Sequence, residues 1–225
     1  MRLRDDALGM ADALDRWLSR QRATVLLVDA GGVLFNNVIE DSTFIGDLAA
    51  YFDVSRHEML TAYAAADRAF ETNARDVHEV IGEAVRALAG RAPGPGDFAQ
   101  IDGLYAAAIV ANAPLFDVLR SARRRGLTLV LANNEAERWD RIKQGRFGHL
   151  DLFDHCASSW KIGACKPTAE YFDRLEDLLR RPRAAWHLLD DNPAVVAQAR
   201  ALGVPATVLT FAPAGEPSQM RGAQT

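Results

Sequence analysis

The chain has 225 residues, of which 49% are hydrophobic and 25% are charged, so it can form one large domain or a core domain that carries an insertion. A net charge of -4 gives no electrostatic reason to expect binding to nucleic acid or to an anionic membrane, and the two cysteines imply no disulfide framework. We find neither a secretion signal nor a run near the ~18 apolar residues that a membrane-spanning helix needs, so a reducing, cytoplasmic setting is expected.

Apolar periodicity and turn residues divide the chain into helices and short buried strands. Strands alternate with helices in the second half of the chain, whereas the segment between the first two strands is helical throughout. The expected elements, in chain order, are a helix at 5–20, a strand at 24–29, helices at 42–52, 55–70, 72–90, 97–111 and 114–125, a strand at 127–131, a helix at 135–145, a short strand at 153–157, a helix at 168–180, a strand at 186–189, a helix at 193–202 and a strand at 206–209.

This order of elements predicts an α/β fold. Strands that alternate with helices form right-handed βαβ units, and such units build a Rossmann-like, doubly wound parallel sheet. We expect residues 1–37 and 112–212 to form this core and residues 38–111 to form an all-helical cap inserted into it. The tail at 213–225 is small, polar and rich in Pro and Gly, and is predicted to be disordered.

The first predicted strand runs straight into an acidic residue. Four aliphatic residues, Val25–Val28, precede Asp29, and the turn after it contains Gly31 and Gly32. In open α/β sheets ligands bind at the carboxyl ends of strands, and paired glycines let the backbone approach a ligand closely. Taken alone, the pattern fits equally well an aspartate that only caps a loop after a core strand.

Other predicted strands also end in polar residues. Asn133 follows the second strand, Asp190 and Asp191 follow the fourth, and Lys166 lies in a loop between them. In a parallel sheet these ends share one edge, where three carboxylates would repel one another unless a cation lies among them. Carboxylate oxygens together with a substrate phosphate suit Mg²⁺, and a lysine there supplies positive charge to a phosphate oxygen.

In this order and spacing, these motifs resemble the haloacid dehalogenase-like (HAD) hydrolase superfamily. The resemblance covers roughly residues 23–35 and 112–210, and the insertion is similar to the small helical cap of that family. The three segments that carry it are Val28-Asp29-Ala30-Gly31-Gly32-Val33-Leu34, Ser158-Ser159 through Gly163 to Lys166-Pro167, and Leu188-Leu189-Asp190-Asp191-Asn192-Pro193.

The resemblance implies a role for each residue of the cluster. Asp29 would be the nucleophile that forms an aspartyl-phosphate, and Lys166 would anchor both Asp29 and the substrate phosphate. Mg²⁺ would be held by Asp29, Asp191 and the backbone carbonyl of Gly31. Asp190 would bind the metal through water or support its direct ligands.

Three positions depart from the usual pattern of the family. Most of its phosphatases place a second Asp two residues after the nucleophile, where it protonates the leaving oxygen and later activates water, but Gly31 stands there. General acid–base help of this kind is worth about 10²–10⁴-fold in rate. Ala132 replaces a phosphate-binding Ser or Thr, which leaves Asn133 and Asn134 as expected substrate contacts, and Val195 replaces a frequent Asn.

The missing acid restricts the expected substrates. The chain resembles most closely the sugar-1-phosphate phosphatase and dehalogenase branch, whose phosphatases also have Gly at this position, although its motifs are degenerate. A leaving group that needs little protonation, such as an anomeric or acyl phosphate, would suit the site. We therefore expect a Mg²⁺-dependent phosphatase for a small phosphorylated metabolite, without nucleic-acid or membrane partners and with a homodimer as one option.

Two other functions remain open. The chain could be a catalytically impaired or repurposed HAD-fold protein that binds a ligand or a protein, or uses Mg²⁺ in diphosphate chemistry. It could also be a 2-haloacid dehalogenase, in which Asp29 displaces halide from carbon without a metal. The Asp190–Asp191 pair argues against the dehalogenase, because that branch needs no metal site.

Overall fold

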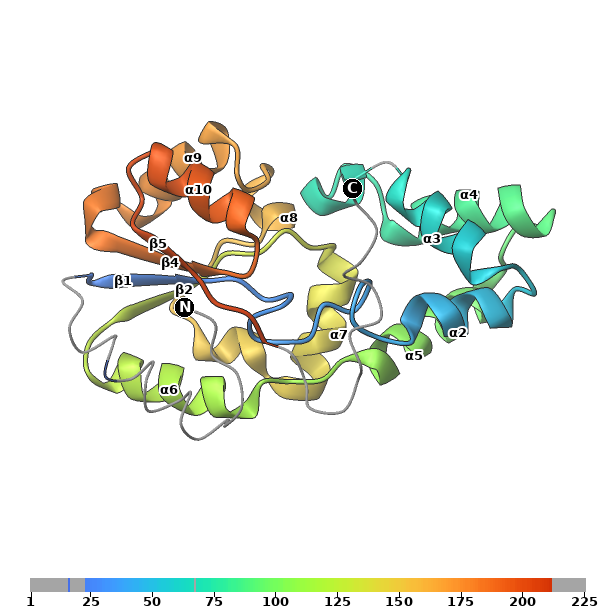
Figure 1. Ribbon diagram of the computed structural model, residues 1–225, viewed down its shortest axis with the longest axis horizontal. Coiled ribbons are helices and arrows are strands. Elements are labelled where there is room, and N and C mark those ends of the chain that lie inside the picture. Colours follow the sequence, from blue (N-terminus) through green and yellow to red (C-terminus); the bar gives the residue numbers. More distant parts are fainter. Residues whose placement is uncertain (1–15, 17–22, 67, 212–225) are drawn as a thin grey trace, which may run out of the picture.

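The computed structural model describes residue 16, residues 23–66 and residues 68–211, which form a core beside a separate group of helices (Figure 1). The core is a five-stranded, all-parallel sheet with the strand order β3-β2-β1-β4-β5. Its strands are β1 (Val25–Val28), β2 (Thr128–Leu131), β3 (His155–Cys156), β4 (Trp186–Asp190) and β5 (Ala206–Val208).

Both faces of the sheet are covered, which explains why its strands read as continuous apolar runs. Along β1, Leu26 and Val28 pack into one apolar cluster and Val25 and Leu27 into a second cluster on the opposite face. Helices α9 and α10 cover one face, whereas α6 lies on the other (Figure 1). The core helices are α6 (Ala113–Arg124), α7 (Glu137–Phe147), α8 (Ser159–Ile162), α9 (Ala169–Leu179) and α10 (Pro193–Ala201), with short 3₁₀ turns η2 (His149–Leu152) and η3 (Arg183–Ala185).

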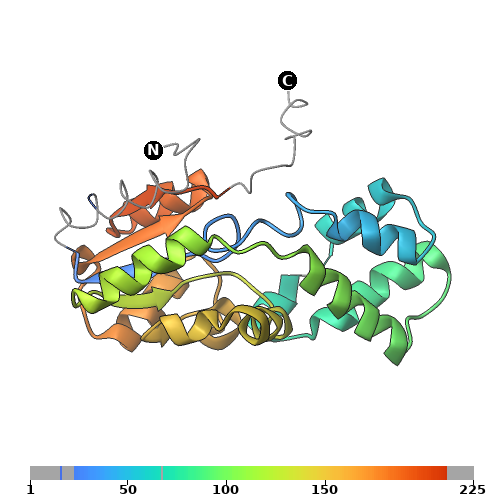
Figure 2. The same ribbon diagram turned by 90° about the horizontal axis from the view of Figure 1, so that it is seen from below.

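The second group of helices lies beyond the carboxyl ends of the strands (Figures 1 and 2). It interrupts the chain between β1 and α6 and contains no described strand. The α/β fold with an all-helical insertion is therefore as predicted. The cap elements are α2 (Phe44–Tyr51), α3 (Arg56–Ala64), η1 (Arg68–Thr72), α4 (Val77–Ala89) and α5 (Pro95–Ala108).

Two chain segments connect the core with the cap and run side by side (Figure 2). The Asn36 amide N–H donates to the Val110 carbonyl at 3.0 Å, and the Asn112 N–H donates to the Leu34 carbonyl at 2.8 Å. Both asparagine side chains add hydrogen bonds across the pair. The domain boundaries expected from the sequence fall next to this pair and stay predictions.

The cap differs from the sequence expectation at one place. The helix predicted at 55–70 ends at Ala64, and the next helix begins at Val77 instead of residue 72. Between them the chain forms η1, then Asn73 adopts a positive φ of 60° that no helix can continue, and Asp76 caps α4. This break buries Phe70 and Glu71 in a tight turn.

Other differences are small. The strand predicted at 153–157 pairs only over His155–Cys156, at the edge of the sheet, and the polar turn after it contains the short helix α8. The helix expected at 5–20 (apart from Arg16) and the tail expected at 213–225 lie outside the described residues. Within the described part of the chain, no helix combines the length and apolar character needed to cross a membrane.

Candidate active site

Three carboxyl groups meet at the carboxyl edge of the sheet. Strands β1 and β4 pair with Val28 opposite Leu189, and the Asp29 N–H donates to the Leu189 carbonyl at 2.9 Å, so Asp29 and Asp190 leave the sheet side by side. With Asp191, they place carboxylate oxygens within 4.8 Å of one another. The structure thus brings together the three acids that the sequence predicted at this edge.

Lys166 lies among these acids. Its Nζ is 3.0 Å from Asp29 Oδ1 and 2.6 Å from Asp190 Oδ2, and only 3% of its side chain is exposed. Burial alone would lower the pKa of this ammonium, but the charges of Asp29 and Asp190 outweigh burial and hold the pKa above its usual value. Lys166 therefore stays charged and shared between two carboxylates.

One ammonium does not balance three carboxyl groups. Burial raises the pKa of Asp29 to about 7, with further rises from Asp190 and Asp191 and an opposing effect of Lys166. Burial, followed by the charge of Asp190, raises the pKa of Asp191 to about 6. A divalent cation would relieve this excess of negative charge, and the all-oxygen donor set fits Mg²⁺.

The two glycines after Asp29 serve different purposes. Gly32 has a φ of 67°, and a Cβ built there would lie 2.1 Å from Asp191 Oδ2, so only glycine lets this carboxylate pack against the backbone. A Cβ at Gly31 would meet no atom within 4 Å. Gly32 is thus required by the site, whereas the position of the missing acid is open space.

The asparagines after β2 point to different partners. Asn134 clamps the backbone of Lys166, because its Nδ2 donates to the Lys166 carbonyl and its Oδ1 accepts from the Lys166 N–H, both at 2.8 Å. Asn133 is buried, and its Nδ2 donates to Asp140 Oδ1 at 3.1 Å. Ala132 is completely buried at the end of the same segment.

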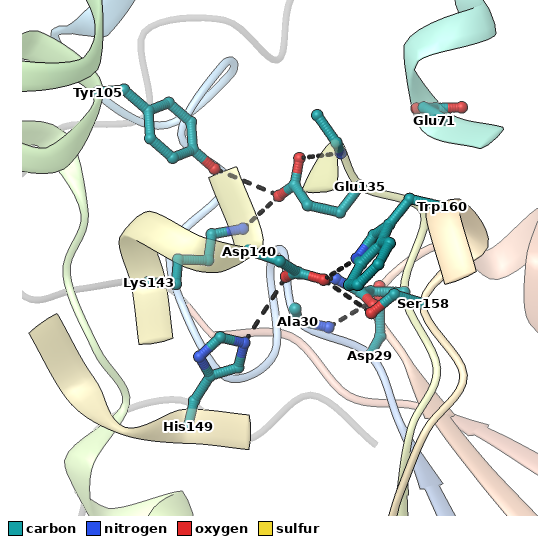
Figure 3. A network of polar contacts seen from close by, with 12 residues as sticks. Asp29, Ala30, Glu71, Tyr105, Glu135, Asp140, Lys143, His149, Ser158 and Trp160 are labelled. Atoms are coloured by element: carbon teal, nitrogen blue, oxygen red, sulfur yellow. Dashed lines mark hydrogen bonds and ion pairs between the residues drawn. The ribbon is translucent and has the colours of Figure 1, made fainter. Parts of the chain in front are cut away.

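Asp140, on α7, is the centre of a buried polar group that the sequence did not predict (Figure 3). Besides Asn133, it accepts hydrogen bonds from Ser158 Oγ at 2.7 Å and Trp160 Nε1 at 2.8 Å, and it faces His149 Nε2 at 3.6 Å. The group joins α7 to the end of β2 and to the loop that leads to Lys166. The sequence offered little signal, because a polar helix residue is normally exposed.

This buried carboxylate stays ionised. Burial would raise the pKa of Asp140, but the facing His149 ring, the Lys143 ammonium and the Ser158 hydroxyl outweigh burial and lower this pKa. Asp140 does not line the cavity, and both of its carboxylate oxygens accept hydrogen bonds from neighbouring side chains. We therefore regard it as a structural support of the site.

A cavity of about 290 Å³ lies between the carboxylate cluster and the cap. Glu135 lies on its wall as part of a second polar group: it accepts hydrogen bonds from Tyr105 Oη at 3.2 Å, from Lys143 Nζ and from the Ala136 N–H at 3.0 Å (Figure 3). Its lining includes Asp29, Gly31, Asn134, Lys166, Asp190 and Asp191 from the core edge, Glu135, Trp139 and Lys143 from the α7 region, Glu40 from the connecting segment, and Tyr63, Arg68, Phe70, Glu71 and Tyr105 from the cap.

Comparison with known proteins gives the same picture. The family model for haloacid dehalogenase-like hydrolases matches residues 23–203. No curated protein sequence matches the chain.

Solved structures of the same family share the fold. A HAD family enzyme from Bacteroides thetaiotaomicron in complex with magnesium and inorganic phosphate is 19% identical, with a TM-score of 0.69 over 88% of this chain and 98% of its own. A protein from Porphyromonas gingivalis described as a predicted HAD-like family hydrolase is 19% identical, with a TM-score of 0.66 over 84% of this chain and 92% of its own. The L-2-haloacid dehalogenase from Xanthobacter autotrophicus with covalently bound chloropropionic acid is 17% identical, with a TM-score of 0.59 over 83% and 77%.

Proposed function

The chain belongs to the haloacid dehalogenase-like hydrolases, and we propose that it is a Mg²⁺-dependent phosphatase acting on a small phosphorylated metabolite. The observation that carries this proposal is the cluster of three carboxyl groups around one buried ammonium at the floor of a cavity. The magnesium and inorganic phosphate bound by the Bacteroides enzyme of the same fold support it further.

Asp29 is the proposed nucleophile. Its carboxylate oxygen attacks the phosphorus of the substrate, a new O–P bond forms, and the bond to the leaving oxygen breaks with its electron pair on the leaving group. Lys166 holds Asp29 Oδ1 by its ammonium and would contact a phosphate oxygen with the same group. Asn134 keeps Lys166 in place through its backbone.

The proposed metal ligands are Asp29, Asp191 and the Gly31 carbonyl, with Asp190 binding through water or supporting the others. When bound, Mg²⁺ supplies positive charge that aligns the phosphate and offsets its repulsion from the attacking carboxylate. Asp190 is already engaged, since its Oδ2 contacts Lys166 and its Oδ1 accepts from the Asn192 N–H at 3.0 Å. Asp191 makes neither contact and is freer to bind a cation.

The size and chemistry of the cavity restrict the substrate. About 290 Å³ is at the lower end of small-molecule sites, which suits a metabolite of modest size. Gly31 cannot protonate a leaving oxygen, so substrates whose leaving group departs unprotonated, such as acyl or anomeric phosphates, should react fastest. Asn133 faces Asp140 instead of this cavity, so Lys166 and Asn134 are the better placed of the expected substrate contacts.

The dehalogenase alternative has weaker support. A halide-displacing enzyme needs no cation, yet Asp190 and Asp191 bring two extra carboxyl groups beside the nucleophile. Their mutual repulsion would destabilise a site that held no metal. The similarity to L-2-haloacid dehalogenase, at 17% identity, concerns the fold alone.

The test is phosphate release from a panel of acyl and sugar phosphates. The wild-type protein should release phosphate with Mg²⁺ and not with a chelator, and Asp29→Asn should abolish release because the nucleophile is lost. The matched control is Asp177→Asn, an exposed aspartate on α9, which should behave as wild type. Release that persists in Asp29→Asn, or none from any substrate in the wild type, would refute the proposed activity.

A further inference from the structure

Hydrolysis through an aspartyl-phosphate needs a base in its second half. Water must attack the phosphorus in line with the bond to Asp29, from the side opposite that carboxylate. The strand ends point toward the cap (Figure 1), and the cavity is lined both by the carboxylate cluster and by cap residues, so a water that attacks from the side opposite Asp29 would come from the cap part of the cavity. Gly31 has no side chain that could take a proton from the water.

Besides the clustered aspartates, three carboxylates line the cavity: Glu40, Glu71 and Glu135. Both oxygens of Glu135 accept from groups that donate more strongly than a thiol: Lys143 and Tyr105 donate to one oxygen and a backbone N–H donates to the other. Glu40 is exposed, and its charge acts on Asp191, one of the proposed metal ligands. Glu71 remains.

Glu71 comes from the cap and is held rigidly. It lies on η1, separate from the Tyr105–Glu135–Lys143 group, and only 10% of its side chain is exposed (Figure 3). Arg68 binds one oxygen, Oε1, through both Nε, at 3.1 Å, and Nη2. This contact fixes the direction of the carboxylate and leaves its second oxygen for another partner.

The second oxygen, Oε2, points to the loop of Lys166. The partner it has there is the thiol of Cys165, with Sγ at 3.7 Å, and a thiol is a weak donor. Burial, followed by the charge of Glu71, raises the pKa of Cys165 to about 11, so this group stays a thiol and does not compete as a base. Glu71 Oε2 is therefore a buried, weakly engaged acceptor beside the residue that precedes Lys166.

From this arrangement we infer that Glu71 is the general base for hydrolysis of the aspartyl-phosphate at Asp29. The inference rests on the proposed phosphatase function. Glu71 Oε2 takes a proton from water, the water oxygen forms a bond to phosphorus, and the bond from phosphorus to Asp29 breaks with its electron pair returning to the carboxylate. Glu71 then gives the proton to the departing phosphate or to solvent.

In most phosphatases of the family one Asp is the acid in the first step and the base in the second, whereas this site has a base, Glu71, and no acid. Glu71 offers an acceptor for the proton of the attacking water, whereas Gly31 offers no donor for the leaving oxygen. The first step therefore proceeds without an acid, and the second proceeds with a base from the cap. An enzyme of this kind accepts only phosphates with good leaving groups, which links the substrate class to the absence of an acid at Gly31.

The test measures the two steps separately in Glu71→Gln, which keeps the shape of the side chain and removes the base. With p-nitrophenyl phosphate and Mg²⁺, we expect a rapid burst of one p-nitrophenolate per enzyme, followed by a steady rate about 10²-fold below wild type. Mass spectrometry of the acid-quenched variant should show one phosphoryl group on Asp29. The matched control is Glu83→Gln, an exposed cap glutamate paired with Arg75, which should show wild-type rates.

A second variant separates loss of the base from disturbance of the cap. Gly31→Asp introduced into Glu71→Gln should restore steady turnover, because the cavity has room for a side chain at Gly31. Three outcomes would overturn the role of Glu71 and leave the phosphatase function standing. They are a steady rate of Glu71→Gln within about twofold of that of Glu83→Gln, a slowed burst without phosphoenzyme, and no rescue by Gly31→Asp. A wild-type protein that releases phosphate from no member of the panel, p-nitrophenyl phosphate included, would overturn the phosphatase function, and this inference with it.

Discussion

The carboxylate cluster and two acid–base pairs elsewhere on the cavity wall differ in their balance of charge. In the cluster, three carboxyl groups lie around one ammonium, which contacts Asp29 and Asp190, and two of the three groups have raised pKa values. Elsewhere on the cavity wall two acids each have a basic partner: Glu135, beside α7, has Lys143, and Glu71, in the cap, has Arg68. Unbalanced charge thus lies where a cation and a phosphate are expected, and balanced pairs lie where the remainder of the substrate would be held.

Removal of Lys166 should change stability and activity more than any other substitution considered. Lys166→Met leaves Asp29 and Asp190 buried without their shared counter-charge, and loss of one partner from a buried pair destabilises by about 3–5 kcal/mol. Phosphatase activity should disappear as well. Urea unfolding and phosphate release measure both effects, and Lys161→Met, which replaces an exposed lysine on α8, is the control. Wild-type stability of Lys166→Met would contradict the shared pairing.

The two glycines allow a sharper test of the carboxylate cluster. Gly32→Ala forces a Cβ onto the Asp191 carboxylate and a positive φ onto alanine, so Mg²⁺ affinity should fall about 10–100-fold, as when a support of a metal ligand is lost. Gly31→Ala meets open space and should bind Mg²⁺ as wild type does. Calorimetric titration with Mg²⁺ compares the two. Equal affinities in both variants would show that Asp191 does not need the close approach.

The Asp140 group should affect stability by a smaller amount. Asp140→Asn retains the shape of the side chain but replaces one acceptor by a donor that faces the Ser158 and Trp160 donors, at a cost of about 1–3 kcal/mol. Asp117→Asn, which removes an exposed pair with Arg120, should cost less than about 0.5 kcal/mol. Urea denaturation measures the free energy of unfolding of both variants. Equal decreases in that free energy would mean that the buried group stabilises the fold no more than a surface pair does.

The parallel sheet and its acidic edge could be predicted because both depend on local features. Short apolar runs such as Val25–Val28 indicate buried strands, and parallel pairing then brings the residues after them together whatever the rest of the chain does. Asp29, Asp190 and Asp191 meet for this reason, and Lys166 joins them from the loop after α8.

The remaining features depend on tertiary contacts that a local pattern does not contain. The helical pattern at 55–70 continues through an alanine-rich stretch, and only burial of Phe70 and Glu71 shows why the chain turns there. Likewise, the sequence cannot tell which of Asn133 and Asn134 faces the site, because neighbouring residues after a strand point in different directions. Asp140 was missed since its partners come from distant segments.

The core edge carries negative charge that should destabilise the fold until a cation binds. Asp191 provides the most direct test. Burial, followed by the charge of Asp190, raises the pKa of Asp191 from its usual value of 3.8 to about 6, so the charged form is disfavoured in the folded state. The folded protein therefore loses stability as the pH rises from the usual pKa to the raised one. Removal of this charge should therefore stabilise the metal-free protein at neutral pH.

The decisive measurement is urea unfolding of wild type and Asp191→Asn at pH 7.5, each with a chelator and with saturating Mg²⁺. We expect Asp191→Asn to be more stable than wild type in the chelator, by about 1–2 kcal/mol after allowance for solvent screening. We also expect Mg²⁺ to stabilise the wild type and to have no effect on the variant. A wild type that does not respond to Mg²⁺, or a variant less stable than wild type in the chelator, would contradict this prediction.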